Sequence, residues 1–233
     1  GLQRMSTQKK FTNQTFSNNN AQSKITRRGI IRFLFASSAI GVLIKNSSKK
    51  AQAEINDTLK HISKPRILGE ADAPIHIIEY YSMTCGHCRD FHNKTFPEVK
   101  TNLIDTGKVK FEFSPFPLDG LALRAHALAR VLPENKYFGM VTLLMSKQDK
   151  WKLAEDPLQS LYRYGQLAGI SAADFNGLMQ NRPLLEKIVE MRQKSSVSWQ
   201  INATPSFVIN NEKVISGNLS FEEFKSELSD YKI

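Results

Sequence analysis

The stretch Glu79-Tyr80-Tyr81-Ser82-Met83-Thr84-Cys85-Gly86-His87-Cys88 decides the fold, because it holds the chain's two cysteines, three positions apart. Ahead of the cysteines, residues 75–81 are rich in β-branched and aromatic side chains, which predicts a buried strand. After them, apolar residues recur at helical spacing over 89–105, and Pro97 is predicted to kink that helix. The cysteines are therefore expected where a strand ends and a helix begins.

The rest of the chain continues as strands and helices in a definite order. Residues 108–113 alternate between polar and apolar side chains, as a half-buried strand does. A hairpin is predicted at 206–209 and 213–215, followed by a helix over 221–231 with a capping box of Ser220 and Glu223. A short helix and a linker are predicted at 54–66, before the first strand. Between the second strand and the hairpin, helices are predicted at 121–129, 136–149, 157–168, 171–180 and 183–198. The order β-α-β, helical block, β-β-α predicts an α/β fold whose first two strands are parallel.

Composition and charge indicate a globular domain that does not bind nucleic acid. The chain has 233 residues, of which 41% are hydrophobic and 23% charged, and its net charge is +10. Residues 1–53 hold ten basic and no acidic side chains, which leaves 22 basic and 22 acidic residues over 54–233. The neutral remainder gives no reason to expect phosphate binding.

The first 53 residues resemble an export signal. A polar segment is followed by Arg27-Arg28 and by an apolar run over 33–44, which is shorter than the roughly 20 residues that span a bilayer. Ala51-Gln52-Ala53 is a candidate cleavage sequence, and the arginine pair resembles a twin-arginine signal. We expect an extracytoplasmic, periplasmic protein; the alternative is an uncleaved amphipathic anchor.

The cysteine pair has two chemical interpretations, a redox couple or half of a metal site. A structural zinc ion takes four ligands, usually from two such pairs, and the chain has no second pair, so no metal site is predicted. At a helix N-terminus, backbone N–H groups and the helix dipole favour the thiolate of Cys85. His87 can add positive charge or donate a hydrogen bond to that sulfur. Cys88, one turn further along, is expected to be buried, protonated and the resolving thiol.

Two segments resemble the DsbA family of disulfide oxidoreductases, over residues 64–233. Residues 79–88 resemble that family's active-site segment, and Ala203-Thr204-Pro205-Ser206-Phe207 resembles its cis-proline loop. The resemblance implies a thioredoxin-like fold, with a thioredoxin domain at 54–134 and 199–233 and a helical insertion at 135–198.

The resemblance also implies roles for individual residues. The Thr204–Pro205 bond should be cis and lie beside the cysteines, and Ala203, Thr204, Pro205 and Gly86 should contact the substrate peptide. Glu79 should be a buried acid that shuttles the proton of the inner cysteine. His126, His76, Trp151 and Trp199 are assigned no chemical role.

The function implied is disulfide formation in exported proteins that carry free cysteines. The enzyme would be a monomer with no cofactor besides the Cys85–Cys88 disulfide, reoxidised by a membrane quinone-linked thiol oxidase. Gly86-His87 stands where the best-known member has Pro-His and resembles protein disulfide isomerase, which predicts a less oxidising potential. An isomerase or reductase using the same site, and a non-redox chaperone or metal-binding protein, stay open as alternatives.

Overall fold

The computed structural model describes residues 52–231, which belong to one compact unit. The predicted signal segment lies outside the described residues, apart from Gln52 and Ala53, which begin a helix over residues 52–63. No helix within 52–231 has the length and apolar character needed to cross a bilayer.

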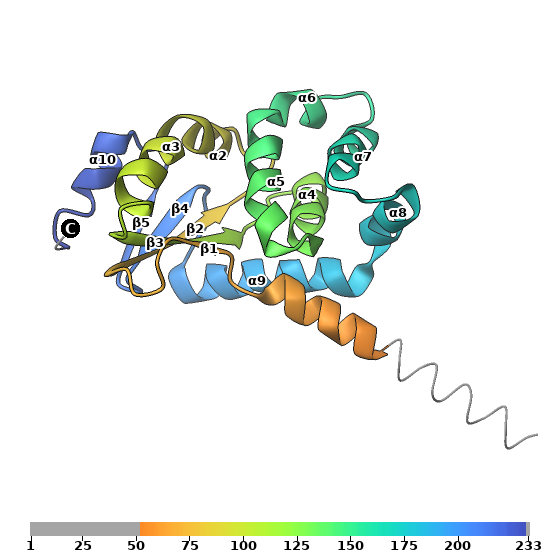
Figure 1. Ribbon diagram of the computed structural model, residues 1–233, viewed down its shortest axis with the longest axis horizontal. Coiled ribbons are helices and arrows are strands. Elements are labelled where there is room, and N and C mark those ends of the chain that lie inside the picture. The colour runs from red at the N-terminus through yellow and green to blue at the C-terminus, as the bar shows by residue number, and fades with distance from the viewer. Residues whose placement is uncertain (1–51, 232–233) are drawn as a thin grey trace, which may run out of the picture. The chain divides into compact units, whose positions relative to one another are not determined.

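A five-stranded mixed sheet forms the centre of the fold (Figure 1). The spatial order is β1-β3-β2-β4-β5. The predicted parallel pair is confirmed between β2 and β3, and all other neighbours are antiparallel. The strands are β1 (Ile67–Leu68), β2 (Ile75–Tyr81), β3 (Val109–Pro115), β4 (Ser206–Ile209) and β5 (Lys213–Ser216).

The helical segment after the cysteines runs without a break from residue 86 to residue 104. It consists of α2 (Gly86–Asp90), a π-helical turn η2 (Phe91–Thr95), α3 (Phe96–Val99) and a second π-helical turn η3 (Lys100–Ile104). Pro97 lies in the first turn of α3, directly after η2. Proline has no N–H to donate, and a widened turn is one way in which a helix passes such a residue. The predicted helix is therefore present, with π turns around the proline.

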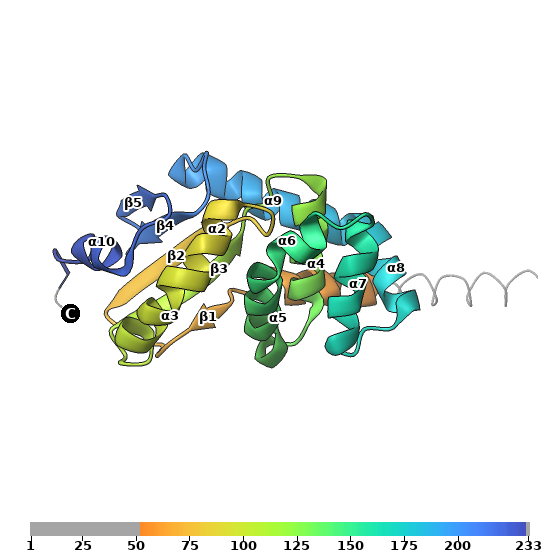
Figure 2. The same cartoon turned by 90° about the horizontal axis from the view of Figure 1, so that it is seen from above.

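Two helical layers cover the sheet, and a group of helices extends to one side. In Figures 1 and 2, α2, α3 and α10 (Phe221–Ser226) lie over one face and α9 (Arg182–Trp199) lies along the other. The remaining helices are α4 (Gly120–Val131), α5 (Glu134–Ser146), α6 (Gln148–Lys152), α7 (Pro157–Leu167) and α8 (Ala172–Gln180). The insertion limits at 135 and 198 remain a prediction.

Two helices differ clearly from the sequence prediction. The helix predicted at 136–149 is divided at Lys147, whose backbone leaves the helical region (φ −112°, ψ 16°) and separates α5 from α6. The last helix begins at the predicted capping box of Ser220 and Glu223 but ends at Ser226, because the chain continues in i→i+3 turns. Within the described residues, the first helix covers 52–63, and the linker expected before the first strand follows it.

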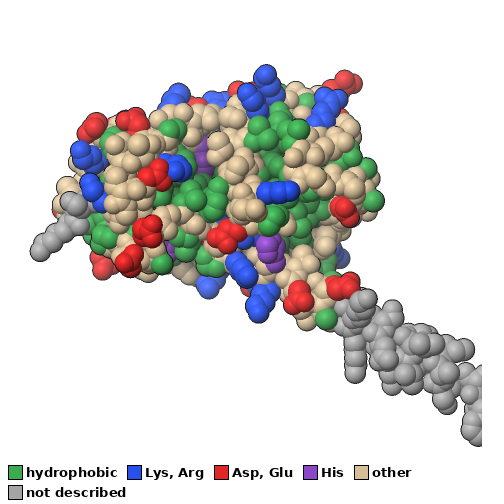
Figure 3. All heavy atoms as spheres, viewed as in Figure 1, with side chains coloured by type: hydrophobic (Ala, Val, Ile, Leu, Met, Phe, Trp, Pro, Cys, Tyr) green, Lys and Arg blue, Asp and Glu red, His purple; other side chains and the backbone are tan. Residues whose placement is uncertain are grey.

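Alternation along β2 decides which of its side chains face the helical segment 86–104. Ile77 and Tyr81 belong to the larger core, together with Phe91 of η2, whereas Tyr80 belongs to a smaller core on the other face. Because side chains of a strand alternate between faces, Glu79 points to the same face as Ile77 and Tyr81. On the surface seen in Figure 3, charges of both signs are scattered among hydrophobic side chains, in keeping with the neutral balance of residues 54–233.

Candidate active site

Cys85 caps the start of α2. Its backbone is extended (φ −76°, ψ 125°), its N–H donates to the carbonyl of Ser82 at 3.2 Å, and its own carbonyl accepts the first helical bond from Arg89 at 3.1 Å. This geometry turns the chain from the end of β2 into the helix. Cys85 is half-buried and Cys88 fully buried, and both are free thiols. The predicted placement at a strand-to-helix junction is confirmed.

The pKa values of the two thiols are shifted in opposite directions. Cys85 has its pKa lowered to about 5, first by a hydrogen bond from Cys88 and then by the Thr204 side chain and the backbone N–H groups of Cys88 and His87, against the opposing effect of partial burial. Burial raises the pKa of Cys88 well above its usual value, and the hydrogen bond to Cys85 and the charge of Glu79 add to that rise. One sulfur is thus prepared as a thiolate, and its neighbour is held as a thiol.

The loop around Pro205 faces the outer cysteine. The Thr204–Pro205 peptide bond is cis, as predicted. In its neutral form, the Cys85 thiol donates to the carbonyl oxygen of Thr204 at 3.3 Å. Thr204 and Pro205 are buried, whereas Ala203 is exposed. The structure therefore brings the two segments of the predicted site together, although they lie more than a hundred residues apart.

Glu79 lies under the cysteines and is 0% exposed. Its Oε1 is 3.0 Å from Nε2 of His92, and its Oε2 has no hydrogen-bond partner within the described part of the chain. His92 is also buried, on η2. Burying a carboxylate is unfavourable unless it is paired. The contact with His92 therefore offsets part of the cost of burying Glu79.

His92 is the functional candidate that sequence reasoning missed. It follows Cys88 by four residues, a spacing that places two helical side chains on one face. Because Cys88 was expected to be buried, its i+4 neighbour could have been identified as the partner of Glu79. The signal was present in the sequence.

The two middle residues of the motif are partly or fully exposed. The side chain of His87 is exposed, and the hydrogen bond that lowers the pKa of Cys85 comes from the His87 backbone N–H. At Gly86, an added Cβ would meet only Arg89 Nη2, at 4.0 Å, so the position has room for a side chain. The roles predicted for both residues remain predictions.

Of the residues assigned no chemical role, His126 and Trp151 are fully buried. His126 is fully buried against Tyr81, with ring centroids 4.8 Å apart, and burial and the charge of Arg130 lower its pKa to about 3. His76 contacts Glu112 at 3.2 Å, and Trp151 is fully buried. Within residues 52–231, no group of three or more His, Cys, Asp or Glu side chains could hold a metal ion.

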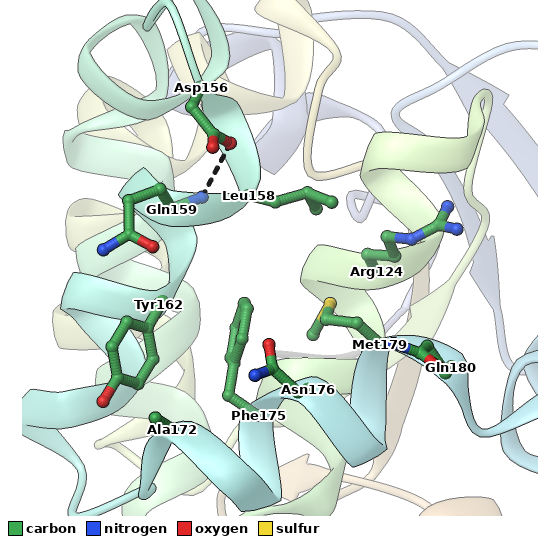
Figure 4. Close-up of a pocket in the computed structure, with 10 residues that line it drawn as sticks. All are labelled: Arg124, Asp156, Leu158, Gln159, Tyr162, Ala172, Phe175, Asn176, Met179 and Gln180. Atoms are coloured by element: carbon green, nitrogen blue, oxygen red, sulfur yellow. Dashed lines mark hydrogen bonds between the residues drawn. The ribbon is translucent and has the colours of Figure 1, made fainter.

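A cavity of about 330 Å³ opens between α4, α7 and α8 (Figure 4). Its lining includes Arg124, Asp156, Tyr162, Phe175 and Met179, and neither cysteine is part of it. Asp156 is occupied as the N-cap of α7, where it accepts from the N–H of Gln159 (Figure 4). The thiol chemistry therefore does not take place in this cavity.

Comparison with known proteins agrees with this geometry. A family model described as Thioredoxin matches residues 61–230. A Rickettsia conorii protein assigned provisionally to the protein-disulfide oxidoreductases is 30% identical over 76% of this chain, which spans 63% of that protein's length, less than two thirds. Disulfide bond formation protein D of Bacillus subtilis is 27% identical, over 70% of this chain and 74% of that protein. The chain also resembles the crystal structure of alpha-DsbA1 from Wolbachia pipientis, with a TM-score of 0.66 and 29% sequence identity. The match covers 72% of this chain and 90% of that one.

Proposed function

Because the chain belongs to the DsbA family of the thioredoxin superfamily, we propose that it is an exported thiol–disulfide oxidoreductase that introduces disulfides through Cys85 and Cys88. The observation that carries the proposal is the contrast between a thiol whose pKa is lowered to about 5 and a buried neighbour whose pKa is raised. A structural pair of thiols would not need this asymmetry, whereas thiol exchange depends on it.

The reaction begins with the Cys85–Cys88 disulfide. A substrate thiolate attacks the accessible Sγ of Cys85, forming a mixed disulfide while Cys88 leaves with the electron pair of the broken bond. A second substrate thiolate then attacks the substrate's own sulfur in that mixed disulfide, and Cys85 leaves as a stabilised thiolate. The substrate has lost two electrons and gained a disulfide, and the enzyme holds a thiolate and a thiol.

The buried pair of Glu79 and His92 is suited to the proton that Cys88 must take up. Cys88 cannot remain a thiolate in its apolar surroundings, and Glu79 lies close enough to influence its pKa. The Glu79–His92 contact of 3.0 Å joins an acid and a base where bulk water has little access. We assign Glu79 as the group that exchanges the proton with Cys88 and His92 as the residue that positions it.

The direction of net transfer follows from the stability of the Cys85 thiolate. Stabilising the reduced form makes the disulfide a stronger oxidant, and a pKa of about 5 lies between that of DsbA, about 3.5, and that of thioredoxin, about 7. The substrate peptide would lie against Ala203 and Thr204, next to Gly86, with Pro205 closing the loop. Extracytoplasmic location, proteins with free cysteines as substrates and a quinone-linked thiol oxidase as reoxidising partner belong to the same proposal.

The direct test uses serine variants in an assay that oxidises a reduced, unfolded model protein. Cys85→Ser should abolish disulfide transfer, because it removes the attacked sulfur. With a disulfide-bonded model protein in place of the reduced one, Cys88→Ser should accumulate a mixed disulfide, because Cys85 attacks the substrate disulfide, one substrate sulfur leaves, and no Cys88 thiol remains to release the other. Full oxidation by Cys85→Ser would refute the oxidoreductase and favour a client-binding or metal-binding protein. If the enzyme only reduces or rearranges disulfides of its substrate and does not oxidise substrate thiols, the reductase or isomerase would be favoured.

A further inference from the structure

The loop that carries Cys85 is held by a short helix distant in sequence. The carbonyls of Met83 and Cys85 both accept from Nε2 of Gln148, each at 2.9 Å. The carbonyl of Thr84, between them, accepts from Nζ of Lys152 at 2.9 Å. Two side chains one turn apart on α6 thus bind three consecutive carbonyls. We call Gln148 and Lys152 the α6 clamp.

We propose that Gln148 is a positioning residue for thiol exchange, which fixes the loop Met83–Cys85 so that the Cys85 sulfur stays against the backbone N–H groups of the first turn of α2. The inference rests on the proposed function, because it concerns how the same thiolate is stabilised. Gln148 does not contact the sulfur itself; it acts through the carbonyl of Cys85, which is also the first acceptor of the helix.

The orientation of the Gln148 amide follows from its partners. Both of its neighbours are carbonyl oxygens, which can only accept, so the NH₂ group must face them. Its Oε1 then has no hydrogen-bond partner within residues 52–231, although the side chain is only 1% exposed. An unsatisfied buried acceptor is destabilising, so glutamine is a poor choice if stability alone matters here. The two hydrogen bonds that Gln148 donates to the loop account for a glutamine at this position.

The helix that carries the α6 clamp is fixed to α5 by a buried side chain. Trp151, between its two members, is fully buried and donates from Nε1 to the carbonyl of Leu144 at 2.8 Å, which joins α6 to α5. Asp149 also reaches Arg89 of α2 with contacts of 3.0 and 2.8 Å, an exposed pair that adds little energy. The helical block therefore supplies a rigid support for the nucleophile's loop.

The consequence for Cys85 follows from geometry. Cys85 stands at the N-cap of α2, so its sulfur lies beside the first turn of the helix, whose N–H groups at His87 and Cys88 lower its pKa. Such interactions weaken steeply with misalignment. Loosening the carbonyls of residues 83–85 would let the cap relax and move the sulfur away from those groups. The thiolate would lose stabilisation while the sheet and the core stayed intact.

The test is the pH titration of the Cys85 thiolate by its ultraviolet absorbance, in the full-length reduced protein, together with the melting temperature. Gln148→Met keeps the side-chain volume and removes both donors and the orphaned oxygen. It should raise the apparent pKa of Cys85 by about one unit, roughly a tenfold loss in the thiolate equilibrium, with little change in melting temperature. Lys152→Met should give a smaller shift in the same direction.

Two controls separate positioning from charge and from stability. Lys150→Met removes one positive charge from α6, as Lys152→Met does, but at an exposed position. It should leave the Cys85 titration unchanged. Leu161→Val, in the core of α7, should lower the melting temperature without moving the Cys85 titration. A Gln148→Met titration equal to that of the parent, with the parent itself titrating near pH 5, would overturn the inference alone. A parent that titrates at the ordinary cysteine value would instead overturn the proposed function.

If Gln148→Met does not fold, Lys152→Met becomes the variant that tests the inference. Lys152 is only half-buried, so its substitution is better tolerated. If Lys152→Met folds and titrates like Lys150→Met, the α6 clamp does not position Cys85 and the inference fails.

Discussion

At the scale of single residues, Cys85 and Cys88 share one helical turn but differ in their surroundings. Cys85 has hydrogen-bond donors around a partly accessible sulfur, whereas Cys88 lies in the core near a carboxylate. The identity of this pair followed from the sequence, because a strand, a motif and a helix occur in immediate succession, whereas a buried acid at Glu79 was implied by the family resemblance. Gln148 did not follow, since a contact across 63 residues has no periodic signal, whereas the i+4 spacing of His92 from Cys88 did offer one.

The lowered pKa of Cys85 predicts a pH dependence of stability. The folded protein binds the Cys85 proton less tightly than the unfolded chain does, so the reduced form gains stability as pH rises from about 5 toward the ordinary thiol pKa, about 8.5. That stability is lost as pH falls through about 5. Urea unfolding of the reduced protein against reduced Cys85→Ser between pH 5 and 8 measures it. Parallel pH profiles for both proteins would contradict the assignment.

Glu79→Gln should slow turnover while leaving the Cys85 thiolate in place. The amide keeps the shape and a hydrogen bond toward His92 but cannot exchange a proton with Cys88. We expect a fall of about 10- to 100-fold in the step that releases or protonates Cys88, measured by stopped-flow reduction of the disulfide form. His92→Asn should show a smaller loss. Identical rates for parent and Glu79→Gln across pH 5–8 would remove Glu79 from the mechanism.

At the scale of elements, β2, β4 and most helix positions were predictable because periodicity and turn residues agree there. The division of α5 from α6 was not, because no glycine or proline separates them and Lys147 simply leaves the helical region. That break matters, since it produces the separate short helix on which Gln148 lies. The early end of α10 likewise depends on tertiary contacts, among them the bond from Lys213 Nζ to the carbonyl of Glu227 at 3.0 Å.

Asp119 joins the first helix of the block to the active-site loop. Its Oδ1 accepts from the N–H of Ala122 at 2.7 Å as the N-cap of α4, and its Oδ2 accepts from Thr84 Oγ1 at 2.7 Å. Asp119→Ala should cost about 1 kcal/mol in the free energy of unfolding, while Asp119→Asn, which retains the cap, should cost less. Urea denaturation of both variants provides the comparison, and equal losses would show that the cap is not the source.

Gly69 lies where the chain turns from β1 toward β2. Its φ is +98°, and an added Cβ would come within 2.5 Å of the carbonyl oxygen of Val109. Gly169 has a similar φ of +91° but open space around it. Gly69→Ala should therefore destabilise by more than the roughly 1 kcal/mol expected for Gly169→Ala, because a steric clash adds to the unfavourable backbone conformation. Equal melting temperatures for the two variants would show that the close approach is unimportant.

At the scale of the whole molecule, the helical block between β3 and β4 supports the reactive loop in addition to covering the domain. Gln148, Lys152 and Asp119 all bind the segment between β2 and α2. The fold class was predictable from the order of elements, and the family is shown by a match over residues 61–230. Contacts between the block and the loop could not be predicted, because they depend on how two distant parts of the chain pack.

The equilibrium redox potential of the Cys85–Cys88 couple tests the central claim most directly. The full-length protein would be equilibrated in glutathione buffers, and the fraction of disulfide followed by thiol alkylation. With the Cys85 pKa lowered to about 5, we expect a two-electron transition above about −200 mV, more oxidising than the thioredoxin couple at about −270 mV. A potential near that of thioredoxin, or no reversible transition, would contradict the account of this protein as a disulfide donor.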